Sequence, residues 1–160
     1  MAHHDELLDQ AVELAGKDLS VVTQADLRRS VSTAYYAVFH LLTTESVAHW
    51  DVPSSRPSLA RMFEHSVMKR VSNRIADPKQ NPFVNENATT VQKLRRLAKI
   101  FVQLQEKRHV ADYDNATYWT QSEALVEVES AMDAFDLWND LRHTKIAQDY
   151  LVSLLIKPRE

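Results

Sequence analysis

Four polar residues recur at helical spacing beside an apolar stripe that is already complete. They are Arg29, Thr33, Tyr36 and His40, and the stripe consists of Val31, Ala34, Tyr35, Val38, Leu41 and Leu42. Because residues three and four apart share one face of a helix, the polar groups line a second face that the core does not need. A guanidinium and an imidazole there could bind phosphate and move protons near neutral pH. Tyr36 is the predicted functional tyrosine, and Tyr35 belongs to the core.

A second candidate, Arg108, ends another apolar stripe. The stripe runs through Leu97, Phe101 and Leu104. A guanidinium placed where an apolar side chain would otherwise continue needs an acceptor, and Asp112 follows at i+4. One interpretation is structural: Arg108 and Asp112 form an ion pair that fastens the end of this helix, and Tyr113 donates a hydrogen bond to the earlier helix.

The other interpretation of Arg108 is chemical. Arg108 would contact a phosphate and stabilise the negative charge that develops on it. His40 or the adjacent His109 would act as acid or base. Tyr36 and Tyr113 would position the substrate through a hydroxyl group or by stacking on a base.

The two strings together resemble a known superfamily. The order Arg29-x6-Tyr36-x3-His40, then a long gap, then Arg108-x-x-Ala111-Asp112-Tyr113 is similar to that of the HEPN superfamily. These are small all-helical domains of prokaryotic toxin, defence and nucleotidyltransferase-partner proteins. The resemblance covers residues 5–143.

The resemblance implies a function and a set of site residues. In many HEPN proteins an Arg followed four to six residues later by His forms a metal-independent ribonuclease site, usually assembled from two copies at a dimer interface. Here Asp112 and Tyr113 occupy positions +4 and +5 from Arg108, and the window holds no His. The expected catalytic residues are Arg108, His40 and His109. The expected binding residues are Arg29, Tyr36, Asp112 and Tyr113.

Two functions follow from this resemblance. The first is an RNA-linked role as a homodimer in a toxin–antitoxin or defence system, by RNA binding or by metal-independent endoribonuclease cleavage. The alternative is a non-catalytic HEPN module that binds a nucleotide or a protein partner, such as a nucleotidyltransferase or an antitoxin-type protein. Whether the chain is an enzyme is left open by the sequence.

Composition sets the class of the protein. The chain has 160 residues, one glycine, five prolines and no cysteine. A single all-α domain over residues 1–160 is expected, because tight hairpins need more glycine and the length suits one core. No metal or cofactor is predicted, since thiolates, paired His/carboxylate spacing and glycine-rich phosphate loops are missing from the sequence. Without a signal peptide or a run of about 18 apolar residues, a cytoplasmic protein outside the membrane is expected.

Hydrophobic periodicity places the elements that must carry these residues. An up-and-down helical bundle of HEPN type is expected, with about five helices and a short C-terminal helix. The predicted helices cover residues 3–17, 23–47, 58–75, 90–110 and 120–141, and the terminal one covers 146–156. Capping boxes mark the starts at Thr23 and Thr120. A flexible loop is expected at 76–90, and the apolar tail should dock on this chain or on a partner.

Charge is unevenly distributed along the chain. Residues 56–110 contain 12 Lys and Arg against four Asp and Glu, whereas the flanking segments are acidic and the whole chain has a net charge of −3. Two interpretations stay open. Complementary helices could pair within the fold, or the basic segment could form a surface for phosphate backbones.

Overall fold

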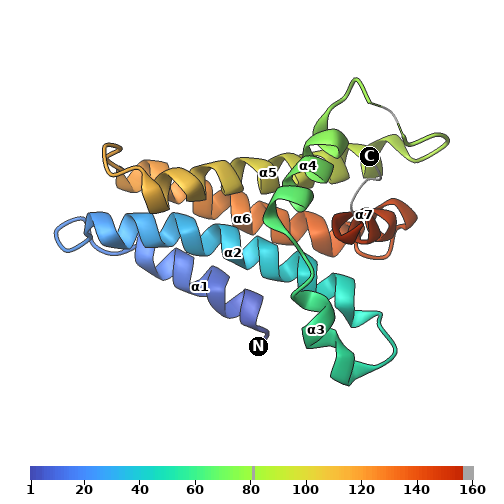
Figure 1. Cartoon of the computed structure of the whole chain (residues 1–160). Helices are drawn as coiled ribbons and strands as arrows, with labels where there is room; N and C mark the ends of the chain where they lie inside the picture. The colour runs from blue at the N-terminus through green and yellow to red at the C-terminus, as the bar shows by residue number, and fades with distance from the viewer. Residues whose placement is uncertain (81, 157–160) are drawn as a thin grey trace.

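Residues 1–80 and 82–156 are described by the computed structural model, and they form an all-α bundle (Figure 1). The helices are α1 (His3–Ala15), α2 (Gln24–Ala48), α3 (Arg56–Ala60), α4 (His65–Ala76), α5 (Ala88–Tyr113), α6 (Gln121–Leu141) and α7 (Lys145–Leu155), with a 3₁₀ turn, η1, at Pro53–Ser55. These ranges contain no strand. The predicted all-α bundle is confirmed, and its HEPN type stays a prediction.

Side-chain caps fix where the long helices begin. The Thr23 hydroxyl accepts from the Asp26 amide at 3.1 Å while the Asp26 carboxylate accepts from the Thr23 amide at 3.0 Å. Thr120 makes the same reciprocal pair with the third residue of α6. Both predicted capping boxes are therefore present. Asn87 caps α5 by accepting from the Thr90 amide, so that helix begins two residues before the predicted start.

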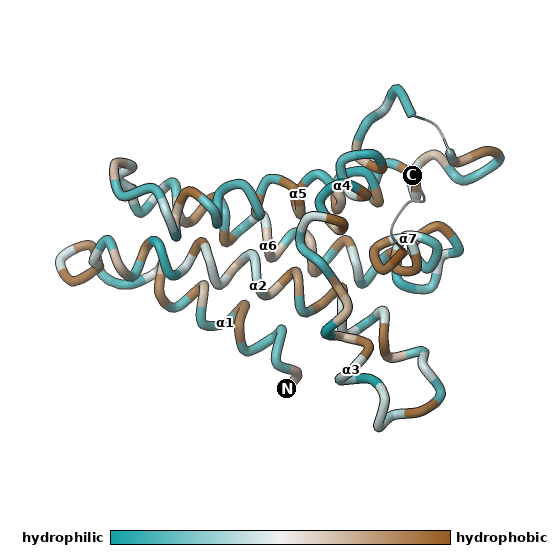
Figure 2. The backbone as a smooth tube through the Cα atoms, in the orientation of Figure 1, coloured by the Kyte–Doolittle hydropathy of each residue, from teal (hydrophilic) through white to brown (hydrophobic). Residues whose placement is uncertain are grey.

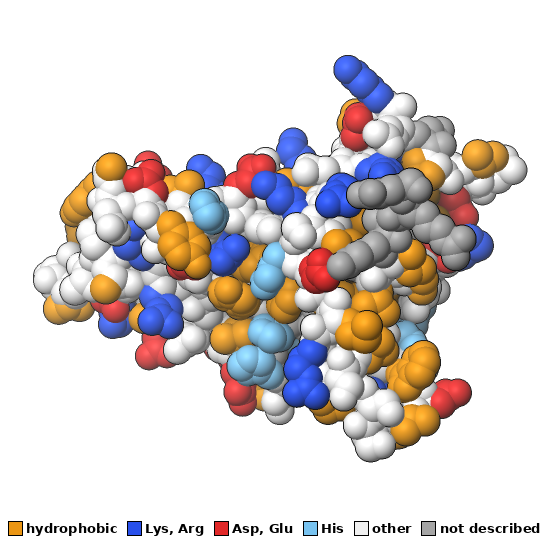
Figure 3. Space-filling view, in the orientation of Figure 1, with side chains coloured by type: hydrophobic (Ala, Val, Ile, Leu, Met, Phe, Trp, Pro, Cys, Tyr) orange, Lys and Arg blue, Asp and Glu red, His pale blue; other side chains and the backbone are white. Residues whose placement is uncertain are grey.

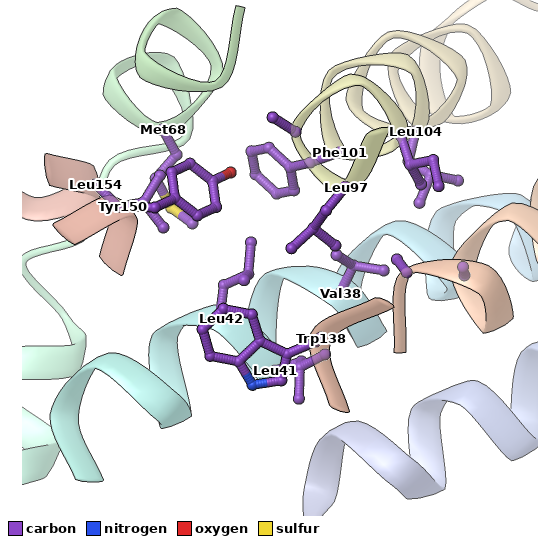
Figure 4. Packing of buried hydrophobic residues seen from close by; sticks show 14 of the residues in the cluster. Val38, Leu41, Leu42, Met68, Leu97, Phe101, Leu104, Trp138, Tyr150 and Leu154 are labelled. Atoms are coloured by element: carbon purple, nitrogen blue, oxygen red, sulfur yellow. The ribbon is translucent and has the colours of Figure 1, made fainter. Parts of the chain in front are cut away.

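The core lies between α2, α5 and α6, which run alongside one another, and α7 packs across one end (Figure 1). Figure 2 shows hydrophobic positions recurring along these helices and covering much of α7. Val38, Leu42, Leu97, Phe101 and Trp138 point into this space in Figure 4 and are almost fully buried. Each such side chain contributes about 1.5–3 kcal/mol by its removal from water. These contacts set the spacing of α2 and α5, the two helices that carry the candidate site.

The helix predicted at 58–75 was wrong as one element. α3 ends at Ala60 and α4 begins at His65, with Glu64 in an extended conformation between them. At the break the Phe63 side chain is buried in the core, whereas Met62 is exposed. Because of this break, α3 stays beside the end of α2 while α4 crosses to pack on α5 (Figure 1).

The predicted loop at 76–90 overlaps a helix-free run at 77–87, of which residue 81 lies outside the described residues. The Arg95 guanidinium holds this run by donating to the carbonyls of Ile75 at 2.8 Å, Asp77 at 2.6 Å and Gln80 at 2.8 Å. One side chain of α5 thus satisfies the backbone at the end of α4 and just after it. The predicted mobility of the loop stays a prediction.

The apolar tail docks on this chain as α7. Ile146, Tyr150, Leu151 and Leu154 are buried against the bundle. The Tyr150 and Ser72 hydroxyls share a buried hydrogen bond of 2.6 Å, which joins α7 to α4. Of the two docking partners that the sequence allowed, the structure selects the chain itself.

The charge asymmetry is partly neutralised between neighbouring helices. The Lys93 ammonium of α5 lies 3.0 Å from the Asp140 carboxylate of α6, and the Arg96 guanidinium lies 3.0 Å from the Asp133 carboxylate. These exposed pairs each contribute little to stability. They do show that the basic helix pairs with the acidic one.

Within residues 1–80 and 82–156, no helix combines the length and hydrophobicity needed to cross a membrane.

Candidate functional site

The candidate site lies where α2, α4 and α5 meet. Tyr35 and Tyr36 come from α2, His65 from the first turn of α4, and Arg108 from the last two turns of α5. In Figure 3, histidine side chains gather on the face of the molecule where α2 and α4 lie, with Lys or Arg side chains beside them. The packing of α4 on α5 and of α5 on α2 therefore brings together residues that are far apart in the sequence.

Tyr35 and His65 form the most buried polar pair of this site. The Tyr35 hydroxyl lies 2.5 Å from His65 Nδ1, and the Tyr35 side chain is fully buried. Burial raises the pKa of Tyr35 far above its ordinary value, so the phenol stays protonated. Burial, with the nearby Arg108 guanidinium, lowers the pKa of His65, so its imidazole is neutral at pH 7. A neutral phenol and a neutral imidazole share this hydrogen bond.

The ring of His65 is held from a second side. It stacks on Phe39 with ring centroids 4.4 Å apart and an interplanar angle of 22°. Tyr36 meets His65 edge to face at 6.1 Å. Aromatic contacts of this kind orient a ring as well as burying it. The imidazole of His65 is therefore fixed by both a hydrogen bond and a stack, while the residue keeps part of its surface exposed.

Arg108 lies over both tyrosines. Its Cζ is 5.1 Å from the centroid of the Tyr35 ring and 5.8 Å from that of the Tyr36 ring, which are cation–π distances. The Arg108 side chain is only 13% exposed. Its closest acidic partner, Asp112, lies 3.6 Å away from the nearest guanidinium nitrogen, beyond normal hydrogen-bond length.

The donors of Arg108 are left largely unused. Within residues 1–80 and 82–156 no hydrogen bond is made by its guanidinium, and Nε is buried without an acceptor. An arginine carries five N–H donors, and buried donors are normally satisfied. The guanidinium is thus positioned by aromatic rings and a distant carboxylate, with hydrogen-bonding capacity left for an anion.

Asp112 connects α5 to α2. Its Oδ2 accepts a hydrogen bond of 3.2 Å from the buried Ser32 hydroxyl and is the same oxygen that faces Arg108. The Asp112 carboxylate is 28% exposed. The predicted Arg108–Asp112 ion pair is therefore present, although loose. The predicted hydrogen bond from Tyr113 to the second helix is absent among the described residues, because Tyr113 points outward and is 67% exposed.

The end of α5 is fastened by an arginine that the sequence did not single out. The Arg28 side chain of α2 donates to the carbonyls of Ala111 at 3.0 Å, Asp114 at 2.9 Å and Thr117. The last carbonyls of a helix have no partner within it, so this guanidinium supplies the missing donors. Arg28 thereby fixes the turn of α5 that follows Arg108.

A shallow pocket opens beside Arg108. It has a volume of about 320 Å³ and is lined by Lys69, Gln105, Glu106, Arg108 and His109. Lys69 and Glu106 lie 3.4 Å apart and largely neutralise each other, so Arg108 gives the pocket its net positive charge. Gln105 donates to the carbonyl of His65 at 3.3 Å, which ties the pocket to the first turn of α4.

His40 extends the histidine cluster toward the N-terminus. Its ring centroid is 6.4 Å from that of Tyr36 and 5.0 Å from that of His3 on α1. Burial, followed by the neighbouring His3, His4 and His65, lowers the pKa of His40. A neutral imidazole is therefore expected at position 40 near pH 7.

The remaining predicted residues lie farther from this centre. Arg29 is exposed on α2 and makes no hydrogen bond or ion pair with the described residues. His109 is exposed and contacts the Tyr113 ring at a centroid distance of 5.0 Å. Thr33, expected on the polar face, is buried. The described residues contain no group of three or more His, Asp or Glu side chains arranged to hold a metal ion.

The sequence offers His65 as a substitute acid/base, four residues after Arg61, but His65 is not among the predicted site residues. A signal was present: His65, Met68 and Ser72 recur at helical spacing, so a polar side chain starts a stripe whose next two positions are buried. The predicted acid/base candidates were His40 and His109. The structure brings His65 closest to the paired tyrosines and Arg108.

Comparison with protein-family models, with curated proteins and with solved structures finds no significant match to this chain.

Proposed function

We propose that this chain binds RNA through the Arg108 site and cleaves it without a metal ion. The observation that carries the proposal is the Arg108 guanidinium, held over the rings of Tyr35 and Tyr36 with no hydrogen bond to another described residue. A phosphodiester supplies the oxygen acceptors that this guanidinium lacks. The resemblance to HEPN proteins supports RNA as the source of that phosphodiester.

The neutral histidines supply the proton transfers that cleavage requires. In this proposal an imidazole accepts the proton of the ribose 2′-hydroxyl as O2′ attacks phosphorus. The P–O5′ bond breaks, leaving a 2′,3′-cyclic phosphate, and the departing O5′ takes up a proton from the imidazolium formed in the first step or from water. Arg108 stabilises the extra negative charge on the phosphoryl oxygens.

His65 takes the acid/base role here in place of the histidine that is missing four to six residues after Arg108. When its Nδ1–H donates to the Tyr35 oxygen, Nε2 carries the free lone pair and serves as the base. His40 is the second candidate, on the other side of Tyr36. The half-buried Tyr36 ring offers a surface on which a base can stack.

The functional form is proposed to be a homodimer in which two copies of the site share one groove, as the HEPN resemblance implies. A toxin or defence role and a location in the cytoplasm belong to the same proposal. Analytical ultracentrifugation of the purified chain tests the dimer directly.

A non-catalytic module that binds a nucleotide or a protein partner is the second candidate function. It is favoured by the shielding of Arg108, which is 13% exposed, and by the Ser32–Asp112–Arg108 chain of contacts, which resembles a structural fastening. In that case the site would hold α2 and α5 together, and an external surface would carry the function.

The deciding experiment measures RNA binding and cleavage in EDTA with the purified full chain. Wild type is compared with Arg108→Ala, His65→Gln and His40→Gln at two salt concentrations. The matched controls are Arg96→Ala, an exposed arginine on the same helix, and His143→Gln, an exposed histidine after α6.

Cleavage that persists in EDTA, falls at least about 100-fold in Arg108→Ala and His65→Gln, and survives in both controls would support the proposal. Binding should weaken as salt increases, because phosphate contacts release counterions. No cleavage and no salt-sensitive binding by the folded wild type would refute the proposal and favour the non-catalytic module.

A further inference from the structure

A second pocket is formed by residues of the last two turns of α5, the loop after it and the first two turns of α6. That loop lies at one end of the bundle (Figure 1). The volume of the pocket is about 290 Å³, and its lining consists of Lys107, Val110, Thr117, Trp119, Glu123, Val126 and Glu127. Lys107 and Arg108 are neighbours in sequence but point about 100° apart around the helix. The two pockets share no lining residue, so this pocket is separate from the Arg108 site.

The pocket contains a buried carboxylate. Glu127 is only 8% exposed, and it sits on the buried face of α6 with Ala124, Val128 and Ala131. No ion pair joins it to any residue in the ranges 1–80 and 82–156. Its carboxylate oxygens are not among the buried atoms that lack a partner, so they stay accessible at the pocket. Burial raises the pKa of Glu127, and the more distant Lys107 lowers it by a smaller amount. The side chain is thus mostly buried while its carboxylate can still accept donors from a bound molecule.

The other side-chain oxygens of the pocket already have partners. The Thr117 hydroxyl donates to the Asp114 carboxylate at 2.8 Å, and the Glu123 carboxylate accepts from the Thr120 amide at 3.0 Å. Glu127 is thus the acceptor that is left for a bound molecule. Since a carboxylate has two oxygens side by side, it best matches a group with two adjacent N–H donors.

The walls of the pocket are rigid and apolar. Trp119 is 4% exposed, and Gln24 holds its backbone by donating to the carbonyl at 2.6 Å and accepting from the amide at 3.0 Å. The indole Nε1 has no acceptor among the described residues. Val110 and Val126 supply further apolar lining. A flat ring or a planar cation suits walls of this kind.

We propose that this pocket binds a planar group with two adjacent N–H donors, of the kind that a guanine base and a guanidinium both present. The N–H pair faces the Glu127 carboxylate, and the flat body lies against Trp119 and the two valines. One lysine and two glutamates give the lining a net negative charge, which disfavours anions and favours a cation or an uncharged base. The volume suits one such group.

Titration calorimetry with the full chain tests this proposal and separates the two sources of the ligand chemistry. Guanosine probes the base, and agmatine probes the guanidinium. Inosine, which lacks the 2-amino group, and adenosine are the controls for guanosine. Binding of guanosine over inosine and adenosine, or binding of agmatine, supports the proposal. Failure of both guanosine and agmatine to bind overturns it.

Glu127→Gln keeps the size of the side chain and removes one of the two acceptor oxygens. It should weaken binding of the successful probe at least tenfold, whereas Glu129→Gln, an exposed glutamate on the same helix, should leave binding unchanged. Unchanged binding in Glu127→Gln overturns the assignment. Arg108→Ala should bind the probe as wild type does, which keeps this test independent of the proposed RNA site.

Thermal unfolding of the probe-free protein adds a readout for folding. Glu127→Gln should unfold at the same temperature as wild type or higher, because it removes a buried charge that has no partner. A lower unfolding temperature would mean that the carboxylate stabilises the fold itself, which would contradict the assignment.

Discussion

Replacing Tyr35 with Phe isolates one hydrogen bond at the centre of the candidate site. The substitution removes the hydroxyl that lies 2.5 Å from His65 Nδ1 and keeps the aromatic ring under Arg108. The net value of a buried hydrogen bond, with one partner left unpaired, predicts a loss of about 1–2 kcal/mol in the free energy of unfolding. For a chain of this length that corresponds to a decrease of about 2–8 °C in the thermal midpoint.

Tyr36→Phe is the matched control for this prediction. The Tyr36 hydroxyl makes no hydrogen bond with the described residues, and the ring contacts of Tyr36 survive the change. The free energy of unfolding should therefore change by no more than about 0.5 kcal/mol. Urea unfolding followed by circular dichroism measures both variants. Equal losses in the two variants, or no loss in Tyr35→Phe, would refute the reasoning that the Tyr35–His65 bond holds α4 against α2.

Two further predictions concern pH and the docking of α7. His40 and His65 have lowered pKa values in the folded chain. As the pH falls through about 6.5, the unfolded chain therefore binds more protons than the folded chain. The free energy of unfolding should decrease by at most about 1.4 kcal/mol per pH unit for each histidine. Urea unfolding between pH 7.5 and 5.5 should show this slope, and His65→Gln should reduce it. A slope that the variant leaves unchanged would contradict the assignment. The raised pKa of Glu127 changes the free energy of unfolding in the opposite direction, equally in both proteins. Tyr150→Phe should cost about 1–3 kcal/mol in urea unfolding because it leaves the buried Ser72 hydroxyl unpaired, and adding Ser72→Ala should cost much less than a second full loss. Strictly additive losses would show that the two hydroxyls do not depend on each other.

Local rules predicted the elements of this fold better than its junctions. The capping boxes at Thr23 and Thr120 placed two helix starts, since a cap depends on residues within one turn. The break between Ala60 and His65 was missed because the apolar residues on either side keep a helical spacing through it. That break depends on where α4 must pack, which is tertiary information.

In the candidate site, too, features within one helix could be predicted from the sequence, whereas contacts between helices could not. Of the two interpretations of Arg108, the structural one predicted an ion pair with Asp112, and a loose pair is present. The pairing of His65 with Tyr35 joins residues that are 30 positions apart on two different helices, and periodicity within one helix carries no information about such a contact. Tyr35 was assigned to the core, and it is buried there, yet its hydroxyl also orients His65. One residue can satisfy packing and polar positioning at once, which a choice between core and site does not allow for.

The fastening of α5 by Arg28 has a consequence for the order in which the chain folds. The carbonyls that Arg28 binds lie 83 to 89 residues later in the sequence, and the nearby Gln24–Trp119 pair spans 95 residues. Closing a loop of that length lowers the conformational entropy of the chain before the stabilising contacts have formed. During synthesis, Gln24 and Arg28 of α2 emerge long before residues 111–119, which they bind in the folded chain. The turn of α5 after Arg108 is thus completed only when Arg28 contacts these distant carbonyls. The candidate site therefore forms only after the second half of the chain has been synthesised.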